Sequence, residues 1–225
     1  MKYISVAIDG PSGAGKSTLA RRAAQQLGFL YVDTGAIYRT VALSAVKRGI
    51  EPGDAERLVP TLAELDIKLE YDPNDGLQHM LLNGEDVTAE IRMHAISARA
   101  STVSAIPAVR AFLLELQREL ARTNHVVMDG RDIGTVVLPE ADVKIFLTAS
   151  AQARAQRRYL ELVQRGQEAD LDTVLRDIIA RDEQDMNRAV APLRQAEDAV
   201  LIDTTTLDLE QSLQAILGVI KERIA

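Results

Sequence analysis

The residues from Gly10 to Ser17 have the types and the spacing that bind a phosphate chain. They read Gly10, Pro11, Ser12, Gly13, Ala14, Gly15, Lys16 and Ser17, fit the pattern G-x-x-x-x-G-K-[ST] and are followed by Thr18. In such a loop the backbone N–H groups face the anion, the lysine reaches the β- and γ-phosphates, and the serine hydroxyl is placed to bind Mg²⁺. The alternative, a plain glycine-rich turn, is disfavoured because an apolar run precedes the loop and a helical pattern follows it. The loop predicts binding of a nucleoside triphosphate.

A second polar cluster bears on the type of reaction. GTPases carry a base-reading N-K-x-D, which this sequence lacks, and an ATPase core usually shows a strand that ends in Asp-Glu. Here the apolar run ends at Asp129 and continues with Gly130, Arg131 and Asp132. Asp129 is suited to hold Mg²⁺ through water, whereas Arg131, two positions later, suits a second phosphate. The pattern favours transfer to a phosphorylated acceptor over hydrolysis.

Two further polar clusters lie after the second apolar run and in a predicted helix. Thr34 and Arg39 follow the second apolar run, where a hydroxyl and an arginine one helical turn on fit a phosphate. An ordinary N-cap with a solvated arginine remains the alternative. Arg181, Asp185 and Arg188 stand at i, i+4 and i+7 of a helix predicted from about residue 172, so they share one face. A surface ladder of ion pairs has the same spacing.

A last cluster, Arg154, Arg157 and Arg158, lies in residues 150–168, a stretch rich in Arg, Gln and Glu. We interpret this stretch as a mobile, solvated helix and loop. Phosphoryl transfer needs cations over the migrating group, and a closing lid would supply them. A merely solvated charged helix is the alternative.

The elements that must position these residues alternate between apolar runs and helical patterns, which is typical of an α/β protein with a parallel sheet covered by helices. The predicted strands span residues 3–8, 29–32, 125–129, 143–148 and 199–202. Predicted helices include one that begins near Pro107 and ends near residue 122, and a final one over residues 207–223.

One segment breaks this alternation. Residues 67–72 and 78–82 read as half-solvated strands, and Asn83-Gly84 predicts a two-residue turn. We therefore expect a small antiparallel subdomain at residues 60–95, inserted into a core made of residues 1–59 and 96–225. Its role is either structural or one of closing over a substrate.

The composition limits the possible partners. The chain has 225 residues, no cysteine and a net charge of −7, which argues against a thiolate zinc site and a nucleic-acid-binding surface. No apolar run approaches the roughly 20 residues that cross a bilayer. Because a strand is predicted from residue 3, we expect no leader peptide. We also expect a cytoplasmic location, which the lack of cysteine fits, and a monomer.

Taken together, these stretches resemble the bacterial cytidylate kinases, which are nucleoside monophosphate kinases. The matching stretches are residues 8–18, 33–39, 129–137, 143–147, 181–193 and 201–207. The resemblance covers nearly the whole chain in the family's order and includes the extra antiparallel domain, on the monophosphate-binding side. It implies a P-loop NTPase-type three-layer α/β fold, with a five-stranded parallel sheet, the inserted subdomain and a mobile lid at about 150–168.

The resemblance also implies a reaction, in which ATP with Mg²⁺ phosphorylates CMP and dCMP to their diphosphates in pyrimidine nucleotide metabolism. It implies that Ser17 and Asp129 hold the metal and that Arg154, Arg157 and Arg158 belong to the lid over ATP. The residues implied to act on the transferred group are Lys16, Arg131, Arg157 and Arg188. Those implied to hold the acceptor are Thr34, Arg39, Arg131 and Arg188 at the phosphate, Arg181 and Asp185 at the ribose, and Ser101, Arg110 and Asp132 at cytosine.

Three rival functions remain to be tested. The nearest is a kinase for another monophosphate or small acceptor, which would not need Arg110 or Asp132. A nucleotide-binding regulatory protein without turnover is disfavoured by the intact Lys16 and Asp129. An RNA-associated NTPase is disfavoured by the acidic net charge.

Overall fold

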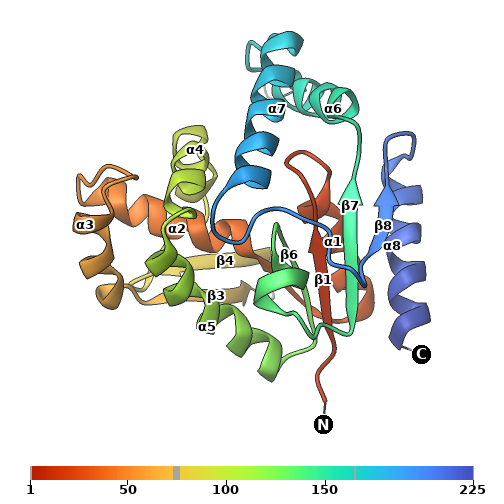
Figure 1. The fold of residues 1–225 in the computed structure, drawn as a ribbon, viewed down its shortest axis with the longest axis horizontal. Helices are drawn as coiled ribbons and strands as arrows, with labels where there is room; N and C mark the ends of the chain where they lie inside the picture. The colour runs from red at the N-terminus through yellow and green to blue at the C-terminus, as the bar shows by residue number, and fades with distance from the viewer. Residues whose placement is uncertain (1, 73–76, 165, 225) are drawn as a thin grey trace. The chain divides into compact units, whose positions relative to one another are not determined.

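The computed structural model describes residues 2–72, 77–164 and 166–224. The chain divides into two compact units, Met1–Val32 with Leu120–Ala225, and Asp33–Glu119. A five-stranded sheet lies in the first unit and a three-stranded sheet in the second (Figure 1).

The sheet of the first unit is the predicted parallel sheet, in the strand order β2-β6-β1-β7-β8. Central strand β1 runs parallel to both neighbours, and Asp9 at its end is in register with Gly130 and Phe146. The carboxyl ends of these strands therefore meet at one edge, where α/β sheets bind ligands. The strands are β1 (Ser5–Asp9), β2 (Leu30–Asp33), β6 (Val126–Gly130), β7 (Val143–Thr148) and β8 (Val200–Asp203).

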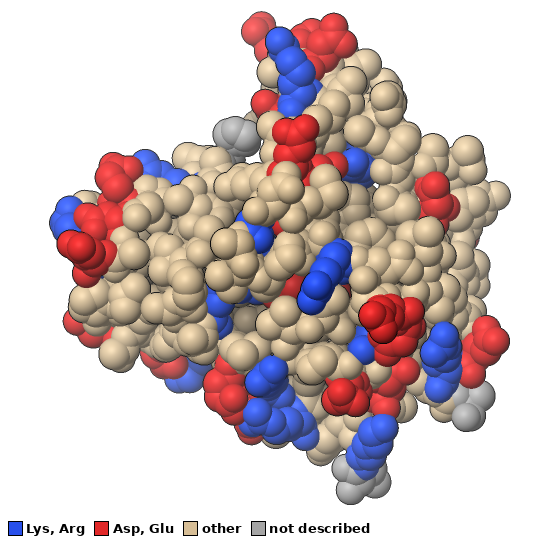
Figure 2. Space-filling view, viewed as in Figure 1, with Lys and Arg blue, Asp and Glu red and all other residues tan. Residues whose placement is uncertain are grey.

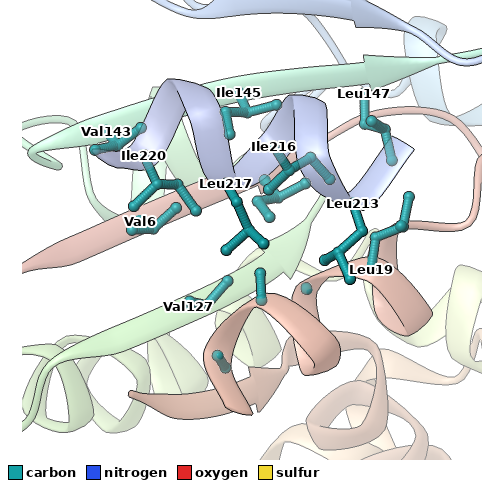
Figure 3. Packing of buried hydrophobic residues seen from close by; sticks show 14 of the residues in the cluster. Val6, Leu19, Val127, Val143, Ile145, Leu147, Leu213, Ile216, Leu217 and Ile220 are labelled. Atoms are coloured by element: carbon teal, nitrogen blue, oxygen red, sulfur yellow. The ribbon is translucent and has the colours of Figure 1, made fainter. Parts of the chain in front are cut away.

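Helices α1 and α8 pack against this sheet and close the main core. In α8 the buried residues Leu213, Ile216, Leu217 and Ile220 recur at helical spacing, and they meet Val6, Leu19 and Ile145 of β1, α1 and β7 in one cluster (Figure 3). The core thus holds the strand that leads into the phosphate loop. The helices of this unit are α1 (Lys16–Leu27), η3 (Ile133–Val137), α6 (Ala151–Gln164), α7 (Leu171–Asn187) and α8 (Leu209–Ile224).

The second unit contains the predicted antiparallel element. Strand β3 pairs with β4, and β4 with β5, so that Leu82 faces Glu85 across a two-residue turn. Asn83 and Gly84, with φ of 52° and 84°, form this turn, since both residue types tolerate the left-handed region that it requires. The strands are β3 (Ile67–Asp72), β4 (Leu77–Leu82) and β5 (Glu85–Asp86). Residues 73–76 of the predicted subdomain lie outside the described residues.

The helices of the second unit carry four of the predicted site residues. Helix α2 packs against α4 and also contacts β4. The predicted helix from Pro107 is confirmed and runs to Thr123, so its last turn passes into the first unit. The helices are α2 (Thr34–Lys47), α3 (Ala55–Leu58), η1 (Val59–Glu64), η2 (Glu90–Arg92), α4 (His94–Val103) and α5 (Pro107–Thr123).

Charged residues of both signs are distributed over the surface. On the face shown in Figure 2, basic side chains are scattered among acidic ones rather than gathered in one stripe. None of the helices in the described part of the chain has the length and hydrophobicity that crossing a bilayer requires.

Candidate active site

The phosphate loop connects β1 to α1, as its sequence predicts. Its first residue must be glycine, because a Cβ atom at Gly10 would lie 1.9 Å from the carbonyl oxygen of Leu147, and the φ of Gly10 is 150°. The loop is thereby pressed against the end of β7. The close approach explains how the neighbouring strand holds the loop in place.

Lys16 is the first residue of α1, and only 5% of it is exposed. Its Nζ donates a hydrogen bond to the carbonyl oxygen of Pro11 at 2.7 Å, within the loop itself. Burial and the nearby Arg131 together lower the pKa of Lys16 to about 7, while Asp129, Asp185 and Asp9 oppose the shift. A buried ammonium beside a guanidinium is an environment in which an anionic ligand would be strongly attracted.

Asp129 lies next to Ser17, as expected of two residues that would hold the same metal ion. The Ser17 hydroxyl donates to Oδ2 of Asp129 at 2.9 Å, and the Tyr31 hydroxyl donates to Oδ1 at 2.8 Å. A hydroxyl and a carboxylate oxygen are ligands that suit Mg²⁺. Within the described residues there is no group of three or more His, Cys, Asp or Glu side chains that could hold a metal.

The loop after β6 pairs its two charged residues with the end of α7. The Nε of Arg131 donates to Oδ2 of Asp185 at 2.7 Å, and Nη2 of Arg188 donates to Oδ1 of Asp132 at 3.0 Å. All four side chains are mostly buried. The structure thus brings together residues that the sequence analysis placed in two separate clusters.

The helical position expected for Arg188 is wrong. Helix α7 ends at Asn187, and Arg188 has an extended backbone, with φ −63° and ψ 141°. Its Nε donates to the carbonyl oxygen of Ala191 at 2.6 Å, a bond that turns the side chain along the segment after the helix. Arg181 and Asp185 remain on α7 one turn apart, as expected.

The interpretation of residues 150–168 as solvated is wrong for Arg154, of which only 4% is exposed. Its guanidinium donates to the carbonyl oxygens of Ala149 and Ser12, each at 2.8 Å, and to Asp182 at 2.6 Å. The charge is tolerated inside because each of its nitrogens has an acceptor. Composition could not reveal this, since two of the acceptors are backbone carbonyls.

The other two arginines of α6 are more exposed. Arg157 donates to the hydroxyl and the carbonyl oxygen of Thr204, and Arg158 pairs with Glu161 at 2.8 Å. In the same helix, Ala155 packs against Val174 and Ile178 of α7, in a small core between the two helices. Arg165 of the predicted lid lies outside the described residues.

The remaining predicted residues lie in the second unit. Thr34 is buried at the start of α2, and the cap of this helix is Asp33, whose Oδ1 accepts from the N–H of Ala36 at 2.8 Å. The other oxygen of Asp33 accepts from Arg39 at 2.8 Å. The N-cap role considered for Thr34 therefore falls to Asp33.

Arg110, on α5, is also buried. It donates to the carbonyl oxygen of Ser104 at 3.2 Å, and its guanidinium carbon lies 5.6 Å from the centre of the Tyr38 ring. This stacking contact holds the guanidinium plane in a defined orientation. Ser101 lies on α4 of the same unit.

Sequence reasoning missed three residues at these positions. Tyr31 binds Asp129, Asp33 binds Arg39, and Asp9 accepts from the backbone N–H groups of Ile133 and Gly134. Asp9 and Asp33 are the last residues of β1 and β2, next to recognised motifs, whereas Tyr31 is the second residue of β2. Position at a strand end could have found the two aspartates.

Comparisons with known proteins show the family of this chain. The family model described as cytidylate kinase matches residues 6–222. A cytidylate kinase of Caldicellulosiruptor bescii is 51% identical over 217 residues, covering 96% of this chain and 95% of the relative. Another, from Leuconostoc mesenteroides, is 48% identical over 225 residues and covers both chains completely.

A solved structure supports the fold alone. An uncharacterized protein from Eubacterium ventriosum superimposes with a TM-score of 0.54 at 12% identity, covering 98% of this chain and 99% of that one. With a family model that spans nearly the whole sequence and relatives at about half identity, the assignment is clear. The chain belongs to the cytidylate kinase family and is a nucleoside monophosphate kinase.

Proposed function

We propose that this kinase transfers the γ-phosphoryl group of ATP to CMP and dCMP, with Lys16 on the donor side and Arg131 and Arg188 on the acceptor phosphate. The observation that carries the assignment is the proximity of Lys16 and Arg131, since Arg131 is the charged group that most lowers the pKa of Lys16. Lys16 is buried and the Arg131 side chain is only 20% exposed, and two cations this close repel each other unless an anion lies between them. A phosphate chain supplies that anion.

The chemistry asked of these side chains is mainly electrostatic. Phosphoryl transfer places negative charge on the oxygens of the migrating group, and fixed cations stabilise that charge. Arg131 and Arg188 are already oriented by Asp185 and Asp132, so little reorganisation is needed when a phosphate arrives. We assign Arg157 and Arg158 of α6 to the donor phosphates, as part of a lid at about 150–168.

The acceptor contacts divide between phosphate, ribose and base. We assign the phosphate also to Thr34 and Arg39, and the ribose to Arg181 and Asp185. For cytosine we assign Ser101, Arg110 and Asp132, because a carboxylate accepts from the exocyclic amine and a guanidinium donates to the ring acceptors. Uracil would put a carbonyl against the carboxylate, which disfavours it.

Mg²⁺ is a further part of the proposal. Ser17 and Asp129 fit it, because their oxygens lie together and are the hard ligands that it prefers. When bound, the ion would neutralise charge on the donor phosphates. The Tyr31 hydroxyl holds the other oxygen of Asp129 and so fixes the carboxylate for this task.

The domain roles follow from these assignments. We propose that residues 1–59 and 96–225 form the kinase core and that the antiparallel subdomain of residues 60–95 serves the monophosphate side. A monomeric state and a cytoplasmic location stay predictions.

The test is ADP formation from ATP and Mg²⁺ with CMP, dCMP, UMP, AMP or GMP supplied one at a time. Turnover that is strong with CMP and dCMP and weak with the others supports the whole assignment. Comparable turnover with another monophosphate would support the kinase activity but contradict the contacts assigned to cytosine. The same assay without Mg²⁺, in excess chelator, tests the metal.

A further inference from the structure

The buried carboxylate of Asp9 binds the backbone of a loop far along the chain. Asp9 is the last residue of β1, its Oδ1 accepts from the N–H of Ile133 at 2.8 Å, and its Oδ2 accepts from the N–H of Gly134 at 2.7 Å. These two N–H groups are the first two of the short helix η3. Asp9 therefore does for this helix what an N-cap residue ordinarily does.

The residue in the N-cap position, Asp132, makes no capping hydrogen bond with its own side chain. The Oδ1 of Asp132 instead accepts from Nη2 of Arg188 at 3.0 Å. An aspartate at an N-cap usually turns back to the first N–H groups of its helix, because these otherwise lack partners. Here the first two N–H groups of η3 already donate to Asp9, which lies 124 and 125 residues away from them in the sequence.

We propose that Asp9 is a positioning residue of this kinase: by capping η3 from β1, it frees the Asp132 carboxylate to face Arg188 and holds the loop that carries Arg131 and Asp132. The inference rests on the proposed function, in which Arg131, Asp132 and Arg188 contact CMP. It assigns to Asp9 no contact with a substrate.

The electrostatics of Asp9 support a role in the site rather than in folding. The pKa of Asp9 is raised to about 6, chiefly by burial and also by the Asp132 charge, while the two N–H donors and the Lys16 charge oppose the shift. The carboxylate is thus ionised at neutral pH although its surroundings disfavour the charge. Groups held against local preference are typical of functional sites.

The experiment uses Asp9→Asn, which keeps the shape of the side chain but presents an N–H₂ group to one of the two N–H donors. The matched control is Asp142→Asn. Asp142 accepts from the N–H of Ser5 at 2.9 Å, so it binds the opposite end of the same strand. A second variant, Gly134→Ala, leaves the carboxylate intact and adds a Cβ atom next to the contact, 3.2 Å from Cδ of Lys144, which must shift, and 3.4 Å from Oδ2 of Asp9, at the edge of ordinary contact.

Two readouts are taken on each folded variant. Hydrogen exchange at the amides of Ile133 and Gly134 should accelerate about 10- to 100-fold in Asp9→Asn, the effect of losing a hydrogen bond to a charged group. The KM for CMP should rise by a similar factor, while the KM for ATP changes about threefold or less, because the loop serves the acceptor. In Asp142→Asn neither quantity should move, and Gly134→Ala should change both in the same direction as Asp9→Asn but by less.

Unchanged exchange at Ile133 and Gly134 would overturn the capping role, and faster exchange with an unchanged KM for CMP would overturn the positioning role. An equal rise of the KM values for CMP and ATP would indicate that Asp9 acts on the phosphate loop, and it would also overturn the positioning role. A direct Asp132→Asn variant separates the two proposals. If that variant phosphorylates CMP and UMP with the wild-type ratio, the cytosine contact fails, while the exchange and the KM for CMP still decide the role of Asp9.

Discussion

The guanidinium of Arg131 and the carboxylate of Asp185 form an ion pair of 2.7 Å between the loop after β6 and the last turn of α7. The two residues are 54 positions apart in the sequence. Only 20% of the one side chain and 10% of the other are exposed. The pair therefore aligns an acceptor-side cation before any substrate arrives.

Substitution of Asp185, the partner of Arg131, should weaken CMP binding. In Asp185→Asn the Arg131 side chain loses its charged acceptor, and we expect the KM for CMP to rise about tenfold or more, in line with the loss of a charge-assisted hydrogen bond. Steady-state kinetics with varied CMP at saturating ATP measures it. Asp177→Asn, at an exposed position of the same helix, is the control. An unchanged KM in Asp185→Asn would contradict the assigned role.

Removal of the Lys16 ammonium should abolish most of the transfer. For Lys16→Ala we expect kcat to fall about 10²–10³-fold, as for other groups that stabilise transition-state charge. Lys221→Ala, on the exposed side of α8, should retain wild-type turnover. Equal unfolding curves of the two variants would show that the loss is catalytic.

Binding of ATP should weaken as the pH rises. The pKa of Lys16 is lowered to about 7 in the protein without ligand, chiefly by burial, so the ammonium is increasingly neutral above that pH. A neutral lysine attracts phosphate less, so the Kd of a non-hydrolysable ATP analogue should increase between pH 6.5 and 8.5. Calorimetry at several pH values measures this trend, which Lys16→Met should lack; the same slope in both proteins would exclude Lys16 as its source.

Base selection should depend more strongly on Asp132 than on Arg188. Asp132→Asn should lower the ratio of kcat/KM for CMP to that for UMP by about tenfold or more, because an amide can serve either base. Arg188→Ala, which removes a contact to the phosphate that both substrates share, should lower both values together. The pair of variants thus distinguishes base reading from phosphate binding, and an unchanged ratio in Asp132→Asn would refute the former.

The ionisation of Asp9 should appear in the stability of the protein. Its pKa is raised from 3.8 in the unfolded chain to about 6, so the folded state holds this proton more tightly. The corresponding stability is fully present below pH 3.8 and is lost as the pH rises through about 6. A shift of about two units corresponds to roughly 3 kcal/mol. Urea unfolding of wild type and Asp9→Asn should show a difference between the two proteins that changes by this order between pH 4 and pH 7, and a constant difference would contradict it.

Two of the three arginines of α6, Arg154 and Arg157, should behave differently from each other. Arg154→Met leaves the buried Asp182 without its partner, and breaking a buried ion pair costs about 3–5 kcal/mol. Arg157→Ala, at a more exposed site, should lower kcat with much less effect on the free energy of unfolding. Chemical unfolding and turnover of both variants test this; similar stability of the two would show that the Arg154 pair adds little.

Much of the fold was predictable because it depends on neighbours in the sequence. The phosphate loop, its flanking strand and helix, and the Asn83–Gly84 turn are each set by residues within a few positions, whose backbone preferences and apolar spacing act locally. The parallel sheet followed from the alternation of apolar runs and helical patterns. For the same reason, the roles carried over from the family motifs could be proposed residue by residue.

Sequence alone thus determined the phosphate loop, the order of the strands and helices along the chain, and the family. Tertiary structure decided which charges pair: Arg131 with Asp185, Arg188 with Asp132, and Asp9 with the backbone at Ile133. It also decided that Arg154 is buried. These pairings join residues 54 to 124 positions apart. The energy of each depends on burial and on acceptors that other segments supply, and no local pattern in the chain encodes either quantity.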